Sequence, residues 1–277
     1  MNIFYRILYA LNHATMPRPA PWGWFHLMWL GLTFAAIFVL WLLRKRQGER
    51  QLKTVLLVYG ITALVLEVTK QIIWSFNYAD GAAVWDYQWY AAPFQLCTTP
   101  IFASLIAAFL KDCPLRRALF SYLAFFTILG SISTMLMPDS CFVETIEINI
   151  HTMWLHMGSF AVSVYLLMSG NVKLDFKSLL RGFYVFLGFA AVADIINIIV
   201  YKSGILHGET FNMFYISPYF VSSLPVFCDI QPKVPYAVYL FLYVFAIGMG
   251  GAIVFGICKC IEKIALKIKS KNTVAID

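Results

Sequence analysis

Charge is scarce in this sequence. Only 13% of its 277 residues are charged, 61% are hydrophobic, and the mean hydropathy is +0.74. Soluble domains carry roughly 25% charged residues, and a chain of this size cannot enclose so much apolar surface in one water-soluble core. The scarcity of charge therefore excludes an ordinary soluble domain and indicates a protein that crosses a membrane several times.

Other features are missing as well. The sequence has no internal repeat, no low-complexity tract and no separate soluble domain. Residues 1–20 lack an apolar core followed by a small-residue cleavage site, so we predict no cleavable signal peptide. The pattern of Ile3, Leu8 and Leu11 with Arg6 instead predicts a short interfacial helix, ended by the prolines that follow.

Seven apolar runs have the roughly 17–25 residues that a membrane-spanning helix needs. We therefore expect an all-α, polytopic bundle of seven transmembrane helices in a single domain. The predicted spans are Trp22–Leu43, Thr54–Phe76, Pro93–Leu110, Arg117–Met137, Ile148–Ser169, Leu179–Tyr201 and Val234–Cys260.

Lysine and arginine gather in alternate connections between these runs. The connections Asn77–Ala92 and Pro138–Glu147 contain neither residue type. The positive-inside rule then predicts an outer N-terminus and a cytoplasmic C-terminus, with a basic tail at 261–277, in a plasma membrane protein. The net charge of +7 is thus a topology signal, and no nucleic-acid partner is expected. The basic residues are Arg44, Lys45, Arg46, Arg50 and Lys53, then Lys111, Arg116 and Arg117, then Lys173, Lys177 and Arg181, and finally the lysines of the tail.

Polar side chains inside the spans are the second signal, because each costs several kcal/mol unless it is paired or faces water. Helical spacing places Glu67, Lys70 and Gln71 on one face, where Glu67 can pair with Lys70. By helix rise, the polar residues lie within roughly 5–15 Å of the outer ends of their helices, which predicts a chamber open to the outer leaflet. Besides Glu67, Lys70 and Gln71, the polar residues in the predicted spans are Gln95, Cys97, Thr98, Thr99, Ser131, Ser133, Thr134, His151, His156, Asp194 and Asn197.

Structural roles are the alternative. A buried Glu67–Lys70 pair can simply fix helix register, and Asp194 and Asn197 can simply bond across helices. His151 falls at the membrane interface, where a histidine needs no special function.

Cys97 and His156 form a candidate catalytic pair. A cysteine at a helix N-terminus is a potential nucleophile, because the helix dipole favours the thiolate. The thiolate would attack a carbonyl, the imidazole would take and return the proton, and an amide such as that of Gln95 would polarise the carbonyl. Asp194 or Glu67 would orient His156.

Several segments in order resemble the YwaF-like integral membrane proteins of bacteria, which are related to the eukaryotic transmembrane protein 164 acyltransferase. The resemblance runs from about Pro93 to Tyr239 and is carried by APFQLC, MPDS, INIHTMWLHMGSFAVSVYLLMSG, ETFNMFYISPYF and KVPYAVYLF. It implies a membrane bundle and acyl transfer between phospholipids, with Cys97 and His156 at the positions of the family's cysteine and histidine. Many bacterial relatives have a histidine where this chain has Gln95.

The resulting hypothesis is a lipid acyltransferase or acyl hydrolase that acts on membrane phospholipid without a cofactor. Glu67, Lys70, His151, Asn197 and Asn212 would bind the substrate. By the family motif, Asn212 lies in the outer loop as part of a lid or rim, although a turn-forming role before Pro218 fits its sequence equally well. A small-molecule or ion transporter and a seven-helix sensor are the alternatives, and the sequence gives no oligomeric state.

Six cysteines divide between the two predicted sides. Cys141 and Cys228 fall in outer loops, where an oxidising compartment permits a disulfide between them. His151 and His156 point roughly 140° apart around a helix, so they cannot share a metal ligand face, and we expect no metal site.

Overall fold

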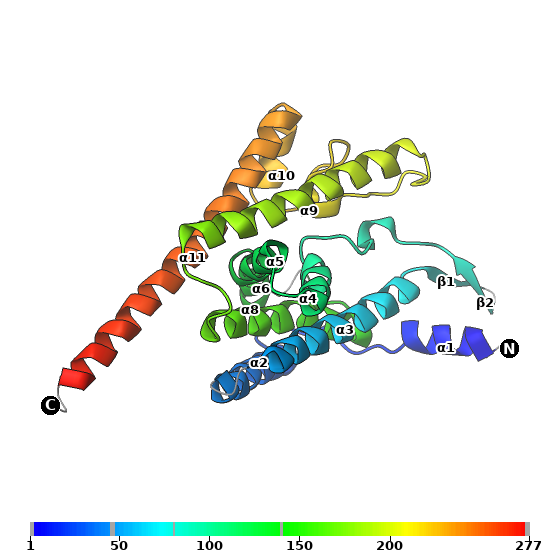
Figure 1. Ribbon diagram of the computed structural model, residues 1–277. Coiled ribbons are helices and arrows are strands. Elements are labelled where there is room, and N and C mark those ends of the chain that lie inside the picture. The colour runs from blue at the N-terminus through cyan, green and yellow to red at the C-terminus, as the bar shows by residue number, and fades with distance from the viewer. Residues whose placement is uncertain (1–2, 45–47, 80, 139–140, 275–277) are drawn as a thin grey trace.

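The computed structural model describes residues 3–44, 48–79, 81–138 and 141–274. Within these ranges, five helices are long and apolar enough to cross a membrane: Trp24–Leu43, Glu49–Ile73, Pro114–Leu136, Phe176–Lys202 and Tyr236–Ile268. The helix Thr99–Phe109 is apolar but shorter. The chain is thus a membrane protein built almost entirely from helices (Figure 1).

The helices follow one another with few other elements. They are α1 (Ile3–Asn12), α2 (Trp24–Leu43), α3 (Glu49–Ile73), α4 (Thr99–Phe109), α5 (Pro114–Phe125), α6 (Thr127–Leu136), α7 (Ile146–Met153), α8 (Ser159–Met168), α9 (Phe176–Lys202), α10 (Phe227–Ile230) and α11 (Tyr236–Val274). Short 3-10 turns occupy Trp89–Ala91, Met213–Tyr215 and Gln231–Lys233. Of the predicted positions, Lys45, Arg46, Asp139, Ser140 and 275–277 lie outside the described residues.

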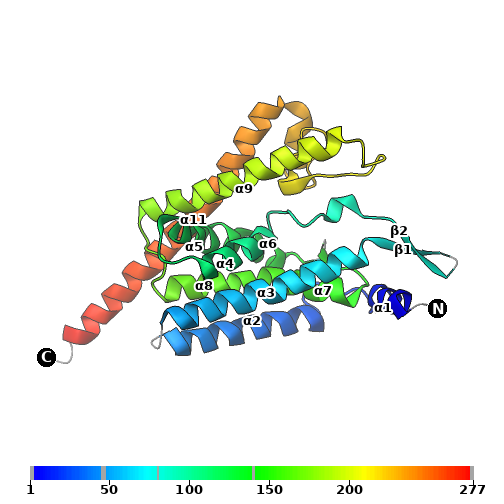
Figure 2. The same ribbon diagram turned by 45° about the vertical axis from the view of Figure 1, so that its right-hand side comes forward.

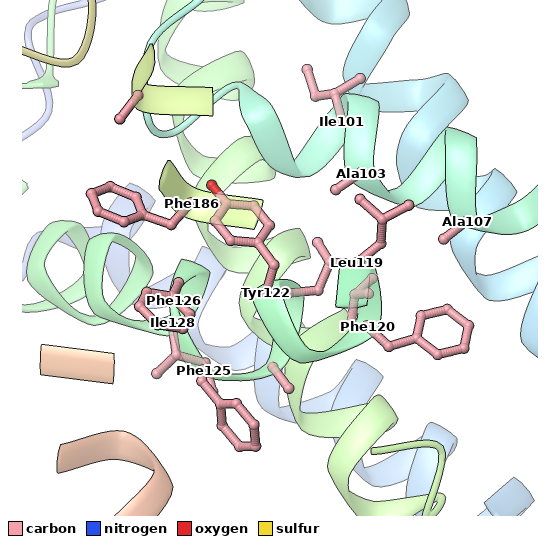
Figure 3. Close-up of a cluster of buried hydrophobic side chains, with 14 of the residues drawn as sticks. Ile101, Ala103, Ala107, Leu119, Phe120, Tyr122, Phe125, Phe126, Ile128 and Phe186 are labelled. Atoms are coloured by element: carbon pink, nitrogen blue, oxygen red, sulfur yellow. The ribbon is translucent and has the colours of Figure 1, made fainter. Parts of the chain in front are cut away.

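The α5–α6 segment is the centre of the bundle. Figure 3 shows Tyr122, Phe126 and Phe186 within its largest apolar cluster. The rings of Phe126 and Phe186 stack with centroids 6.0 Å apart. Gly182 lets α9 approach α5 closely, because a Cβ there would lie 2.9 Å from the backbone of Ser121. Aromatic packing around α5 therefore supplies the apolar core.

The third predicted span is wrong at its start. Helix α4 begins at Thr99, not at Pro93, so Gln95, Cys97 and Thr98 lie in the turn that enters it. The Thr98 hydroxyl accepts a hydrogen bond from the Gln95 N–H at 2.9 Å, which closes that turn. The helix starts where Pro100 can occupy its first turn without losing a hydrogen bond.

The segment predicted as the fifth span, Ile148–Ser169, forms a continuous but irregular helical run that is not among the five candidate spans. Helices α7 and α8 are joined by one turn of π-helix, Trp154–Gly158, which contains His156. Single π-turns inside α-helices are rare and occur frequently at functional sites. The sequence reading contained no signal for this turn.

One end of the bundle carries most of the non-helical structure. The hairpin β1 (Phe76–Ala79) and β2 (Ala82–Trp85) lies beside α1 at the end opposite the C-terminus (Figure 2). The sequence analysis predicted no strands in this connection, although an Asp-Gly pair between strand-forming residues is a hairpin signal. The segment 203–235 folds back beyond the end of α9 and leads into α11.

Candidate functional site

The second span contributes a buried ionic cluster. The Glu67 carboxylate accepts hydrogen bonds from Lys70 Nζ at 2.7 Å and from Gln71 Nε2 at 2.8 Å. Its other oxygen lies 2.7 Å from His151 Nε2 on α7. The exposed fractions of Glu67, Lys70 and His151 are only 3%, 6% and 4%. The expected Glu67–Lys70 contact is present, and His151 is buried in the same cluster instead of lying at the surface of the bundle.

Gln71 extends this cluster toward the outer connection. Its amide donates to the Ala91 carbonyl at 2.7 Å and accepts from the Tyr87 hydroxyl at 2.6 Å. Both carboxylate oxygens of Glu147, at the start of α7, are buried and have no hydrogen-bond partner among the described residues. Glu147 is also within electrostatic range of Lys70 and Glu67. Polar groups from three parts of the chain thus meet at one end of α3 and α7.

Cys97 lies two residues before α4 and packs against the main apolar core. The charged groups of Lys70 and Glu67 act electrostatically on its thiol. Tyr59 and Tyr122 are also electrostatic neighbours of Cys97. The Tyr122 hydroxyl shares a hydrogen bond of 2.5 Å with Thr99, the first residue of α4. The thiol therefore lies just before the N-terminus of α4, within the protein and within electrostatic range of Lys70 and Glu67.

Tyr59 links the Cys97 region to the π-turn. Its hydroxyl donates to the Leu155 carbonyl at 3.2 Å, and this carbonyl belongs to the residue before His156. Gly158 makes room for the ring, since a Cβ there would lie 2.9 Å from Tyr59 Cδ2. Tyr59 lies two helical turns before Glu67, on the same face of α3. That spacing was the available sequence signal, and the sequence analysis missed it.

Amide side chains hold the loop between α9 and α11 in place. Gln95 donates to the Asn212 carbonyl at 3.2 Å and accepts from the Phe214 N–H at 2.9 Å. Asn197 makes the same pair of contacts with Met213, at 2.9 and 2.7 Å. Buried backbone outside regular helices needs such internal partners, and Met213 and Phe214 are fully buried. In this structure the amide of Gln95 is therefore engaged by protein backbone.

The loop that these amides hold is strained. Phe214 and Tyr215 both have positive φ, 58° and 61°, a conformation that is unusual for aromatic residues. Asn212 stabilises the turn from within, because its side chain accepts from the Ser217 N–H at 2.8 Å and donates to the Phe220 carbonyl at 3.1 Å. The turn-forming role considered for Asn212 is thus present in the structure.

Glu67 and Asp194, the two carboxylates proposed to orient His156, have other partners in the structure. Glu67 hydrogen bonds to His151, as described above, and Asp194 accepts from the Tyr236 hydroxyl on α11. The same hydroxyl lies 2.8 Å from the Ile216 carbonyl. His156 lies against the backbone of Gly130 and within electrostatic range of His151. Of the two carboxylates considered for His156, Glu67 therefore contacts His151 and Asp194 contacts Tyr236.

The expected disulfide is absent among the described residues. Cys228 has a free thiol, so no bridge joins it to Cys141. Instead, hydrogen bonds from Gln95, Asn197, Tyr236 and Tyr239 fasten the outer loop. These contacts fasten the loop between α9 and α11 to the turn before α4, to α9 and to the first turn of α11.

Comparison with known proteins identifies the chain at the level of its family. No curated protein and no solved structure matches it. The model of the TMEM164 family matches residues 21–255, which include α2 to α10 and the first half of α11. All of the polar residues described above lie within the matched range. The chain therefore belongs to the TMEM164 family of membrane proteins.

Proposed function

We propose that this protein transfers or hydrolyses acyl chains of membrane phospholipids, with Cys97 as the nucleophile and His156 as the general base. The observation that supports this most directly is the position of Tyr59. It is an electrostatic neighbour of Cys97 and is hydrogen bonded to the carbonyl of Leu155, next to His156. The side chain of a single residue thus connects the entrance of α4 with the π-turn.

The reaction divides into two steps. The imidazole of His156 takes the thiol proton, and the thiolate of Cys97 adds to the carbonyl carbon of a glycerol ester. The bond between that carbon and the glycerol oxygen then breaks, and the imidazole returns its proton to the leaving oxygen. A hydroxyl of a second lipid, or water, releases the acyl chain from the thioester by the reverse sequence.

The surroundings of Cys97 fit a lipid substrate. Cys97 packs against the apolar core, and its thiol is within electrostatic range of Lys70 and Glu67. A phospholipid presents the same division, because its ester carbonyls lie between the acyl chains and the charged headgroup. In this proposal, Glu67, Lys70, His151 and Asn197 form the polar layer for the headgroup, Asp194 and Asn212 support the covering loop, and the reaction occurs in the outer leaflet of the plasma membrane.

Acyl transfer is tested on the purified protein in nanodiscs that contain phosphatidylcholine with an isotopically labelled acyl chain. Mass spectrometry measures the lysolipid formed and a hydroxylamine-sensitive acyl group on Cys97. We expect Cys97→Ala to abolish the adduct and His156→Ala to slow its formation at least a hundredfold. Cys258→Ala, which removes another free thiol, and His13→Ala are the matched controls. Equal adduct in all variants would disprove the nucleophile.

The buried ionic cluster favours a second candidate function, proton-coupled transport. Glu67, Lys70 and His151 are ionisable and almost fully buried, and such groups in a membrane often form proton pathways. A proteoliposome flux assay separates the two functions. Transport predicts a flux that survives Cys97→Ala and is lost in Glu67→Gln, whereas acyl transfer predicts no such flux.

A further inference from the structure

A groove separate from the polar cluster opens between α9 and α11. Its volume is about 220 Å³, and it is lined by Phe126, Leu179, Leu180, Phe183, Val244, Phe245, Gly248 and Met249. Every lining residue is apolar or glycine. In Figures 1 and 2, α11 crosses α9 near the beginning of α9 and then continues past the bundle. Because both helices are candidate spans, hydrocarbon surrounds this groove.

The size of the groove fits a segment of a lipid chain. An engineered apolar cavity of roughly 150 Å³ holds benzene, so 220 Å³ accommodates a segment of an alkyl chain. Gly248 sets the width of the groove, because a Cβ there would lie 3.0 Å from the ring of Phe183 on α9.

Cations lie at one mouth of the groove. Lys259 and Lys263 follow Gly248 by 11 and 15 residues, which is close to three and four whole turns, so they continue the face of α11 that lines the groove. Lys177, near the start of α9, is exposed at the same end. The rise from Gly248 to Lys259 is about 16 Å, close to the roughly 15 Å depth of one hydrocarbon leaflet.

We propose that this groove binds one anionic phospholipid, with an acyl chain against Gly248 and Phe183 and the phosphate at Lys259 and Lys263. The lipid belongs to the leaflet on the C-terminal side of the bundle. Lys259 contacts Glu262 at 3.2 Å, but both side chains are about 40% exposed. Such an exposed pair contributes little, so the ammonium is available to a phosphate. A symmetric pair of α11 helices would instead bring the lysines of two copies together, which is repulsive.

Native mass spectrometry tests this proposal. The full chain is exchanged from vesicles of equal phosphatidylglycerol and phosphatidylcholine into detergent, and the lipid that remains bound is identified. We expect wild type to retain one phosphatidylglycerol. Gly248→Leu, which fills the groove, and the double variant Lys259→Gln/Lys263→Gln should each reduce retention about tenfold. Cys97→Ala should retain the lipid, because this site is independent of acyl transfer.

Matched controls make the outcome decisive. Gly188→Leu adds the same side chain to α9 at a glycine with open space around it, and Arg50→Gln/Lys111→Gln removes the same charge from exposed loop and helix-end positions. Both controls should retain phosphatidylglycerol as wild type does. The proposal would be overturned if phosphatidylglycerol stayed bound to both Gly248→Leu and Lys259→Gln/Lys263→Gln, or if the two controls lost it equally. It would also be overturned if the wild-type protein were a dimer and Gly248→Leu made it a monomer, because the groove would then be a protein interface.

Discussion

Gln95 and Phe214 lie 119 residues apart in the sequence, yet the Phe214 N–H donates to Gln95 Oε1 at 2.9 Å. The contact joins the turn that contains Cys97 to the strained turn of the outer loop. It therefore couples the position of the loop to the entrance of α4. The Phe94 ring, in the same turn, also stacks on the Phe214 ring, so a change in either segment is expected to reach the other through the Gln95 amide and this ring contact.

Removing that amide should loosen the loop locally. We expect Gln95→Leu to leave the Phe214 N–H without a partner, whereas the Asn212 carbonyl still accepts from the Tyr215 N–H, at a cost of about 1–3 kcal/mol. Hydrogen exchange at Phe214 should then be about ten times faster, while exchange within α9 is unchanged. Gln88→Leu is the control, because the Gln88 amide contacts only the nearby Asp86 carbonyl. Unchanged exchange at Phe214 would show that the loop is held without Gln95.

The ionic cluster should tolerate removal of both charges better than removal of one. Glu67→Leu leaves the Lys70 ammonium buried without its counter-ion, which typically costs about 3–5 kcal/mol. The double variant Glu67→Leu/Lys70→Met should recover most of that loss in thermal unfolding in detergent. Asp112→Ala breaks an exposed ion pair with Arg117 and should cost no more than about 1 kcal/mol. A double variant less stable than Glu67→Leu would contradict this account.

Replacing each of two glycines of α9 by alanine should change the free energy of unfolding in opposite directions. Gly182→Ala places its Cβ 2.9 Å from the Ser121 backbone, so overpacking should lower the free energy of unfolding by about 1–3 kcal/mol. Gly188 has nothing within 4 Å of that position. Gly188→Ala should therefore be stabilising, by up to about 1 kcal/mol, through helix propensity. Similar unfolding temperatures for both variants would contradict the close packing of α5 on α9.

Stability should fall with rising pH because of Glu147. Burial raises the pKa of the Glu147 carboxyl from 4.5 to about 7; Lys70 opposes this shift and Glu67 adds to it. The folded protein therefore prefers the protonated acid, and this contribution is complete below 4.5 and lost as pH rises toward 7. Glu147→Gln mimics the protonated form.

The stability advantage of Glu147→Gln over wild type should be near zero at about pH 4 and reach up to about 3 kcal/mol at about pH 8. Glu144→Gln, which changes an exposed carboxyl nearby, is the matched control. Thermal unfolding of the three proteins in one detergent measures the difference. An advantage of equal size at both pH values would exclude Glu147 as the titrating group.

Long apolar runs made the main helices predictable. The sequence placed spans at Trp22–Leu43 and Leu179–Tyr201, and the structure has helices at Trp24–Leu43 and Phe176–Lys202. Hydrocarbon length and hydrogen bonding within one helix depend only on local sequence. The start of α4 at Thr99 was not predictable in the same way, because the preceding turn is held by Gln95 contacts to the distant outer loop.

The sequence by itself determined that this is a helical membrane protein with costly polar residues in several spans, since composition and hydropathy are properties of the chain alone. Tertiary structure decided which of those residues meet. The Glu67 carboxylate forms its hydrogen bond with His151 and not with His156, and the Asp194 carboxylate accepts a hydrogen bond from the Tyr236 hydroxyl. Hydrogen bonds between distant segments depend on how helices rotate and pack against one another, and side-chain periodicity within a single span does not specify that packing.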